Sequence, residues 1–175
     1  MNWLLLLHQI PPQPPYFRAK VLRRLNQIGA LAIKNSAYLL PASDEGLEDL
    51  QWVRQEIERE GGEAWLFRVE SLAGLSDDSI REAFRTLREP DYKELSENAR
   101  SLLERIRKEG GAETNGEGEW RKLAQRFEEI SKLDFFQAAG RKETETLMET
   151  IDRNLHKPRQ RKETKLRPRD VKGGT

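Results

Sequence analysis

The chain has 175 residues, of which 36% are hydrophobic and 35% are charged. This low apolar share predicts that part of the length is solvated helix or tail. The absence of cysteine excludes disulfides, thiolate metal sites and thiol redox chemistry. The only imidazoles, His8 and His156, lie far apart in the sequence, so we expect neither a zinc site nor a cofactor.

The net charge of +1 conceals three segments of different sign. Residues 1–42 hold five basic side chains and no acid, and residues 43–155 hold 18 basic and 28 acidic side chains. Residues 156–175 hold eight basic and two acidic ones. Each of the two positive segments is predicted to attract polyanions.

The apolar run at residues 3–7 has no preceding charge and no small-residue cleavage site. It does not resemble a signal peptide, and no apolar segment approaches the length of a membrane span. We therefore expect a cytoplasmic protein that does not enter a membrane.

The first 72 residues show six elements with clear boundaries. Strands are predicted at residues 3–9, 30–34, 37–40 and 64–69, and helices at residues 16–28 and from about residue 43 to 60. Gly29 is placed to end the first helix, and Ser43 or Asp44 to cap the second. The order strand-helix-strand-strand-helix-strand predicts a ferredoxin-like β-α-β-β-α-β module over residues 1–72, in an α+β chain.

Residues 73–155 are predicted to form a helical extension. The apolar spacing predicts a short helix that Pro90 ends, a second one over residues 92–106, a third that starts near Trp120, and a last one over residues 141–155. Antiparallel pairing of these helices would bury their apolar faces against each other, the sheet or a second subunit. Residues 156–175 are basic and nearly free of apolar side chains, which predicts a disordered tail.

The first helix places its cations on the side opposite its apolar stripe. Lys20, Arg23 and Arg24 lie together there, and no acid is available for pairing along the helix. One interpretation is an ordinary solvated face, and the other is a surface for nucleic-acid phosphates. We assign Lys20, Arg23, Arg24 and Lys34 to nucleic-acid binding.

Arg18 differs from these cations, because its helical angle puts it near the apolar stripe, between Leu22 and Leu25. A structural role would pair it with a carboxylate of the acidic helices. A functional role would bind phosphate or another tetrahedral oxyanion, which a guanidinium fits well. We assign Arg18 as a candidate anion-binding residue and leave both roles open.

No catalytic constellation is visible. The sequence holds no phosphate-binding glycine loop, no HExxH and no GxSxG. His8-Gln9 stands where a metal-dependent nuclease of this type would need an acid. Trp52, Trp65 and Phe67 are interpreted as packing residues, since the RNA-binding signature of such sheets is missing. We expect no enzymatic activity.

The stretch from Ile10 to Phe67 resembles the N-terminal domain family of the chromate-resistance regulatory protein ChrB. The resemblance is carried by the proline-rich loop, Arg18, Arg23-Arg24-Leu25, Gly29-Ala30, Tyr38-Leu39-Leu40-Pro41, and Glu56-Ile57 through Gly61-Gly62. It continues more weakly through Phe84, Arg88, Tyr92 and Leu95, and covers about two thirds of the chain.

The resemblance implies a chromate-responsive transcription regulator of the bacterial cytoplasm. Fuller members carry a second, C-terminal domain, which we expect to be missing here because the chain ends in the basic segment. The leading hypothesis is a regulatory protein that binds duplex DNA through the basic helix and tail. The alternatives are a sensor of chromate or another oxyanion, and a structural module that forms a homodimer.

Overall fold

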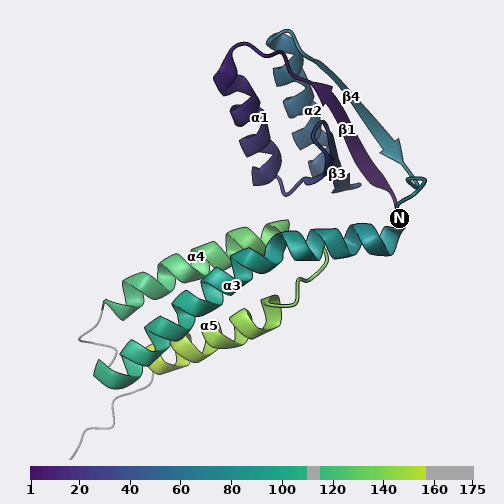
Figure 1. The fold of residues 1–175 in the computed structure, drawn as a ribbon. Coiled ribbons are helices and arrows are strands. Elements are labelled where there is room, and N and C mark those ends of the chain that lie inside the picture. The colour runs from purple at the N-terminus through teal and green to yellow at the C-terminus, as the bar shows by residue number, and fades with distance from the viewer. Residues whose placement is uncertain (110–114, 157–175) are drawn as a thin grey trace, which may run out of the picture.

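The computed structural model describes residues 1–109 and 115–156 (Figure 1). Its first six elements follow the order predicted from the sequence, and three helices follow them. Their bounds are β1 Trp3–Gln9, α1 Pro15–Gln27, β2 Leu31–Lys34, β3 Ala37–Pro41, α2 Asp44–Arg59, β4 Glu63–Val69, α3 Asp77–Glu109, α4 Gly116–Leu133 and α5 Arg141–Leu155. The predicted basic tail, apart from His156, lies outside the described residues.

The four strands form one antiparallel sheet in the order β2-β3-β1-β4. β1 is a central strand, with Leu4 opposite Leu40 of β3 and Arg68 of β4. Its almost uninterrupted apolar sequence fits a strand that has cover on both faces. A sheet of this kind with separate helices agrees with the predicted α+β class.

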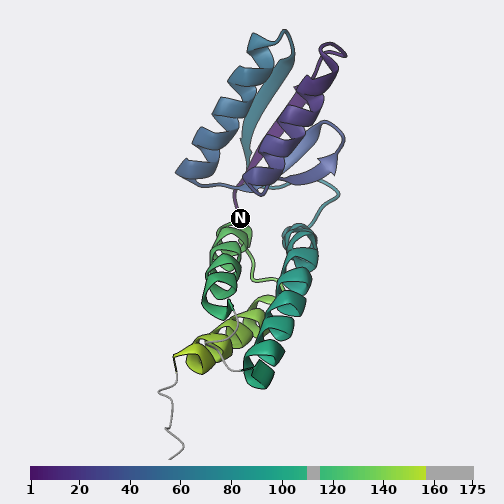
Figure 2. The same cartoon turned by 90° about the vertical axis from the view of Figure 1, so that its left-hand side faces the viewer.

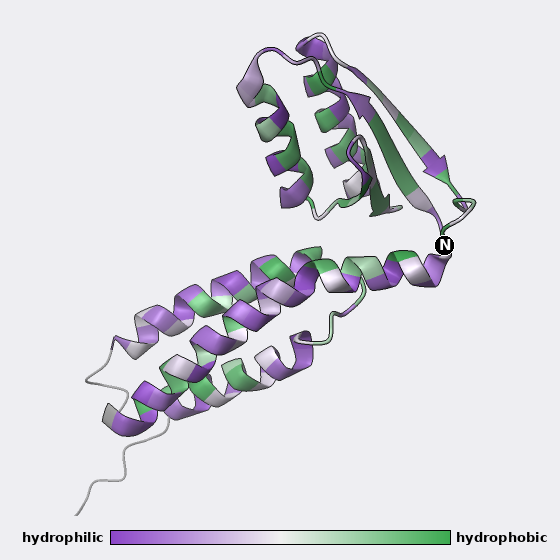
Figure 3. Ribbon diagram, in the orientation of Figure 1, coloured by the Kyte–Doolittle hydropathy of each residue, from purple (hydrophilic) through white to green (hydrophobic). Residues whose placement is uncertain are grey.

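Helices α1 and α2 lie side by side over one face of the sheet (Figure 2). Each contributes three buried side chains to a core shared with β1 and β3: Phe17, Val21 and Leu25 from α1, and Leu50, Val53 and Ile57 from α2. Figure 3 shows hydrophobic residues along much of the strands and alternating hydrophobic and hydrophilic bands on the helices, as amphipathic packing requires.

Two predicted helix boundaries are confirmed by local geometry. Ser43 caps α2, because its Oγ accepts a hydrogen bond from the backbone N–H of Gly46 at 3.0 Å. Gly29 follows α1 with a φ of 74°, a conformation that glycine adopts without steric cost.

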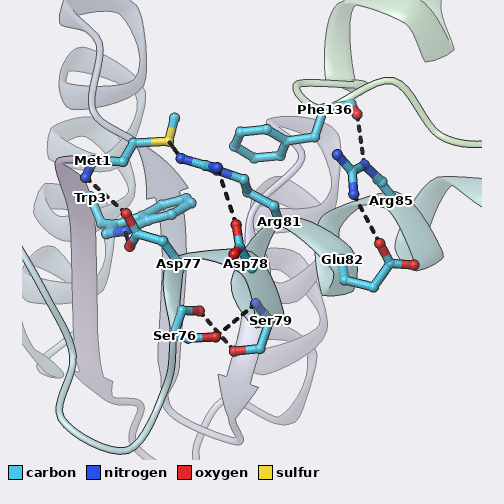
Figure 4. A network of polar contacts seen from close by, with 10 residues as sticks. All are labelled: Met1, Trp3, Ser76, Asp77, Asp78, Ser79, Arg81, Glu82, Arg85 and Phe136. Atoms are coloured by element: carbon cyan, nitrogen blue, oxygen red, sulfur yellow. Dashed lines mark hydrogen bonds and ion pairs between the residues drawn. The ribbon is translucent and has the colours of Figure 1, made fainter.

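The first turns of α3 cover part of the second face of the sheet. The Trp3 ring stacks on Phe84 with centroids 6.0 Å apart, and Phe136, between α4 and α5, lies 5.4 Å from Phe84. The Trp3 indole N–H donates to Asp77 at 2.9 Å, and the N-terminal ammonium contacts the same carboxylate at 2.8 Å (Figure 4). The start of α3 is therefore fixed to β1 by both apolar and polar contacts.

The prediction that Pro90 ends a helix is wrong, since α3 continues through it. Proline costs a helix interior about 3 kcal/mol, because it removes one backbone hydrogen bond and crowds the preceding turn. Burial of Phe84 before it, and of Tyr92 and Leu95 after it, offsets this cost at about 1.5–3 kcal/mol for each side chain. Pro90 itself is exposed, and Figure 1 shows α3 changing direction along its length.

Helices α3, α4 and α5 pack on one another, so the predicted pairing of the helices becomes a three-helix arrangement. The α5 bounds agree with the prediction of a last helix over residues 141–155. The buried core of this bundle is Ala99, Leu102, Leu103, Ile106, Met148 and Ile151.

A buried polar contact holds the junction of α4 and α5 against α3. Tyr92 Oη donates to Asp134 Oδ2 at 3.0 Å, and the backbone N–H of Ala138 donates to Asp134 Oδ1 at 2.9 Å. Arg141 Nη1 lies 3.5 Å from the same carboxylate, whose side chain is only 1% exposed. Burial raises the pKa of Tyr92 from 10.0 to about 12.

Replacement of Tyr92 by Phe is expected to lower the free energy of unfolding by about 1.5–3 kcal/mol, because the lost hydrogen bond ends on a buried carboxylate. Since the folded pKa of Tyr92 is raised, its contribution is complete below pH 10 and declines as the pH rises towards about 12. Urea unfolding across this pH range measures both effects. Tyr16→Phe, at a side chain that is 65% exposed, is the control, and equal stabilities for the two variants would contradict the prediction.

Asp77→Asn is expected to reduce the loss of stability at acidic pH. The hydrogen bond from the N-terminal ammonium, and then that from Trp3, lower the pKa of Asp77, so its stabilisation is present above its unfolded pKa and lost as the pH falls through the folded value. Thermal unfolding as a function of pH tests this. Asp78→Asn neutralises a carboxylate whose side chain is 92% exposed and should leave the acid profile unchanged.

Candidate functional site

The cations that the sequence places on the outer side of the first helix are exposed in the structure. Lys20, Arg23 and Arg24 all project from α1 on the side away from the core. The buried stripe of α1 fixes this orientation, because one face of an amphipathic helix can meet the sheet only by turning the other outward. The predicted exposure is confirmed, and the predicted binding role stays open.

These cations line a groove between the two helices of the first module. The α1–α2 groove has a volume of about 460 Å³ and is lined by Lys20, Arg23, Arg24, Gln27, Trp52, Glu56 and Arg59. Four of the seven are cations, and Glu56 is the one acid among them. Such a surface attracts anions at short and intermediate range.

One of the cations is paired. Lys20 Nζ lies 2.6 Å from Glu56 Oε1, and the hydrogen bond and charge of Glu56 raise the pKa of Lys20. The side chains are 50% and 29% exposed, so the pair contributes little to stability and can open towards a competing anion.

The remaining arginines of the groove are available. Within residues 1–109 and 115–156, Arg23, Arg24 and Arg59 form no ion pair or side-chain hydrogen bond. The acids of the helical bundle pair with basic residues of that bundle instead, as when Arg88 contacts Asp91 at 3.0 Å and Lys132 contacts Glu128 at 3.1 Å. Arg23 borders a second groove, between α1 and the helical bundle, that Asp91 and Glu129 also line, but neither acid forms an ion pair with it among the described residues.

Lys34 lies in a different groove from the other predicted nucleic-acid ligands. The hairpin groove, beside the turn between β2 and β3, has a volume of about 880 Å³. It is lined by His8, Gln9, Ile10, Arg18, Leu22, Ala32, Ile33, Lys34, Asn35, Ser36 and Tyr38. The structure thus brings together Arg18 and Lys34, to which the sequence gives separate roles.

The inward position predicted for Arg18 is wrong. Its side chain is exposed, and it forms no ion pair within the described residues. Arg18 belongs to the first turn of α1, beside the end of the sheet, where the lining residues that the structure describes include no acid. The helical angle alone cannot show this, because it does not record where the strands under the helix end.

His8 is the site residue that the sequence analysis missed. It is 7% exposed, and its ring stacks on Tyr38 with centroids 5.6 Å apart. Burial and, secondly, the charge of Arg18 lower the pKa of His8. The signal is visible in β1, where Leu4, Leu6 and His8 alternate on the face buried under the helices.

Three aromatic residues are more exposed than predicted. Trp52, Trp65 and Phe67 are 53%, 49% and 45% exposed, so the interpretation as packing residues is wrong. Trp65 and Phe67 alternate along the edge strand β4, on the face that the first turns of α3 cover only in part. Trp52 lies on α2 and lines the α1–α2 groove.

Neither a metal cluster nor a membrane span is found in the described part of the chain. No group of three or more His, Cys, Asp or Glu side chains within residues 1–109 and 115–156 could hold a metal ion. No helix of those residues is long and apolar enough to cross a bilayer. The expectation that the chain has no enzymatic activity stays a prediction.

Comparison with known proteins gives a match over most of the chain. The family model for the N-terminal region of protein ChrB matches residues 18–162, which include most of α1, all of α2 and the three-helix bundle. Protein ChrB of Cupriavidus metallidurans is 27% identical over 138 residues. This alignment covers 77% of the chain and 40% of that relative, and no solved structure matches.

Proposed function

The chain belongs to the family of the ChrB N-terminal region, and we propose that it is a chromate-resistance-related regulatory protein that binds nucleic acid. The chain spans 40% of the length of the curated relative, so the proposal concerns the module that the two share. It assigns the binding surface to the α1–α2 groove and the outer face of α1.

One observation carries the proposal: Arg23 and Arg24 are exposed side by side and have no ion-pair partner within the described residues. Unpaired arginines on a solvated helix repel each other, and a neighbouring acid would normally balance them. The backbone of a nucleic acid supplies negative charge at regular short spacing, and its release of counterions adds to the affinity.

The groove favours contacts with phosphates over the reading of bases. One concave surface holds four cations and a single acid: Lys20, Arg23, Arg24, Arg59 and Glu56. Such a surface can bind the phosphates of a backbone, but it has no fixed pattern of donors and acceptors that would distinguish one base from another. Duplex DNA, the partner expected from the sequence, is the ligand for which we propose this surface. The basic segment at residues 157–175, which lies outside the described residues, would add further phosphate contacts.

We further infer that residues 1–72 form a ferredoxin-like module. The order of the first six elements and the antiparallel arrangement β2-β3-β1-β4 support this assignment. The cytoplasmic location and the homodimer expected from the sequence stay predictions.

An oxyanion-binding role for Arg18 is the second candidate function. The observation that favours it is the absence of an ion pair at Arg18 within the described residues, in a groove that no acid lines. Calorimetry with chromate and sulfate tests this role. Titrations that show no heat of binding for either anion would exclude it.

The double variant Arg23→Gln/Arg24→Gln is expected to weaken binding to duplex DNA by about tenfold or more, because two charge-assisted contacts are lost. Fluorescence anisotropy with a labelled duplex at low salt measures the effect. The control Arg107→Gln/Lys108→Gln removes the same charge from two exposed residues at the far end of α3. Equal losses in both variants would contradict a localised interface, and undetectable binding by the native chain would exclude the proposal.

Glu56→Gln is expected to strengthen binding to the same duplex several-fold, since it removes the one acid of the α1–α2 groove and frees Lys20. Glu58→Gln on the same helix is the matched control, because Glu58 pairs with Arg54 and does not line the groove. An affinity gain that is equal in the two variants would show only a net-charge effect and would contradict the assignment of the groove.

A further inference from the structure

The hairpin groove contains a buried polar side chain without a partner. His8 is 7% exposed, and neither Nδ1 nor Nε2 has a hydrogen-bond partner within the described residues. A buried polar group left in this state costs about 1–3 kcal/mol. Its backbone is held firmly, since the N–H of His8 donates to the carbonyl of Ser36 at 2.9 Å. The unmet hydrogen bonds therefore belong to the ring itself and point to a ligand.

The charges around His8 specify the sign of that ligand. Arg18 from α1 and Lys34 from the end of β2 both line the groove, and neither has an ion-pair partner within the described residues. None of the described residues that line the groove is acidic. Burial and the nearby guanidinium lower the pKa of His8, so its ring is neutral at pH 7 and keeps one N–H donor and one acceptor nitrogen.

The size and walls of the groove indicate more than a bare inorganic anion. Its volume of about 880 Å³ falls in the range of pockets that hold small organic ligands. One part of the lining is apolar, with Ile10 and the stacked rings of His8 and Tyr38 beside Leu22 and Ile33. Apolar walls next to two free cations fit an organic molecule with one anionic end.

We propose that the hairpin groove binds a small organic phosphate monoester of about nucleotide size. Arg18 and Lys34 contact the phosphate oxygens, the guanidinium through paired N–H groups and the ammonium as a point charge. The His8 ring N–H donates to the ligand once the ring turns towards the groove, because both of its nitrogens are covered in this structure. The ring of Tyr38 and the aliphatic side chains contact the organic part.

This inference does not depend on nucleic-acid binding by the α1–α2 groove, because the two grooves share no lining residue. It rests on the second candidate function, anion binding at Arg18, and specifies the class of anion. The source of the monoester, a free metabolite or the phosphorylated end of a nucleic acid, is distinguished by the choice of probe.

The two histidines of the chain supply a direct readout. In the imidazole region of a ¹H–¹⁵N spectrum, His8 reports on the groove and His156, at the end of α5, serves as an internal reference. The full chain is titrated with the nucleoside 5′-monophosphates, ribose 5-phosphate, inorganic phosphate, sulfate and the unphosphorylated nucleosides. A duplex with and without a 5′-phosphate forms the second arm.

The expected result is a saturable shift of His8 alone, with a phosphate monoester binding about tenfold or more tightly than inorganic phosphate or sulfate. Unphosphorylated nucleosides should leave His8 unshifted. A 5′-phosphate-dependent shift with the duplex, and none with the free monoesters, would assign the monoester to a nucleic-acid end.

Arg18→Gln is expected to weaken monoester binding by roughly ten- to a hundredfold, since a charge-assisted contact is lost. Arg24→Gln, on the same helix but outside this groove, should bind the monoester as the native chain does. Both positions are exposed, so folding is expected to survive each change. Absence of a His8 shift both with every free monoester and with the 5′-phosphorylated duplex would overturn the inference. Equal affinity for inorganic phosphate, or native affinity in Arg18→Gln, would overturn it as well.

Discussion

The burial of the apolar stripe of α1 against the sheet determines where the charges of this protein lie. Phe17, Val21 and Leu25 are at most 1% exposed, and burial of three such side chains contributes on the order of 5–8 kcal/mol. A rotation of the helix that hid its cations would expose this stripe and bury charges without partners, which costs far more. The outward position of Arg23 and Arg24 therefore follows from hydrophobic packing, and no interaction of the two arginines is needed to produce it.

The second face of the sheet has a complementary effect. Because Trp3, Phe84 and Phe136 fix the start of α3 to β1, the acidic bundle extends away from the sheet. Its carboxylates form ion pairs with basic residues of the bundle itself, as Asp91 does with Arg88. The chain is nearly neutral as a whole, yet Arg23 and Arg24 have no ion-pair partner among the described residues, even though Arg23 borders a groove that Asp91 and Glu129 also line. A neutral average gives no information about such a surface.

Local signals made the first 72 residues predictable. Gly29 and Ser43 mark helix ends through their own backbone and side-chain chemistry, so the six elements could be placed from the sequence. The helix end predicted at Pro90 is wrong because the cost of a proline is local, whereas the burial of Phe84 and Tyr92 that offsets it depends on distant partners. The three residues are close in sequence, but their contacts are on different parts of the fold.

The candidate sites were predictable only in part. The helical period places Lys20, Arg23 and Arg24 on one outer face, and this needs no tertiary information. The partnership of Arg18 with Lys34 and His8 could not be predicted, because it arises where the end of α1 meets the end of the sheet. The alternation of buried residues in β1 places His8 on the face under the helices. A single polar residue on a buried face does not by itself distinguish a ligand-binding side chain from a packed one.

If the outer face of α1 binds the phosphates of a nucleic acid, Arg23 and Arg24 must contribute to the salt dependence of DNA binding. Each phosphate contact contributes about 0.9 to the slope of log K against log salt concentration. The slope of the Arg23→Gln/Arg24→Gln variant is expected to be smaller in magnitude than that of the native chain by about 2. An unchanged slope, at any affinity, would show that these arginines do not contact the phosphates of DNA.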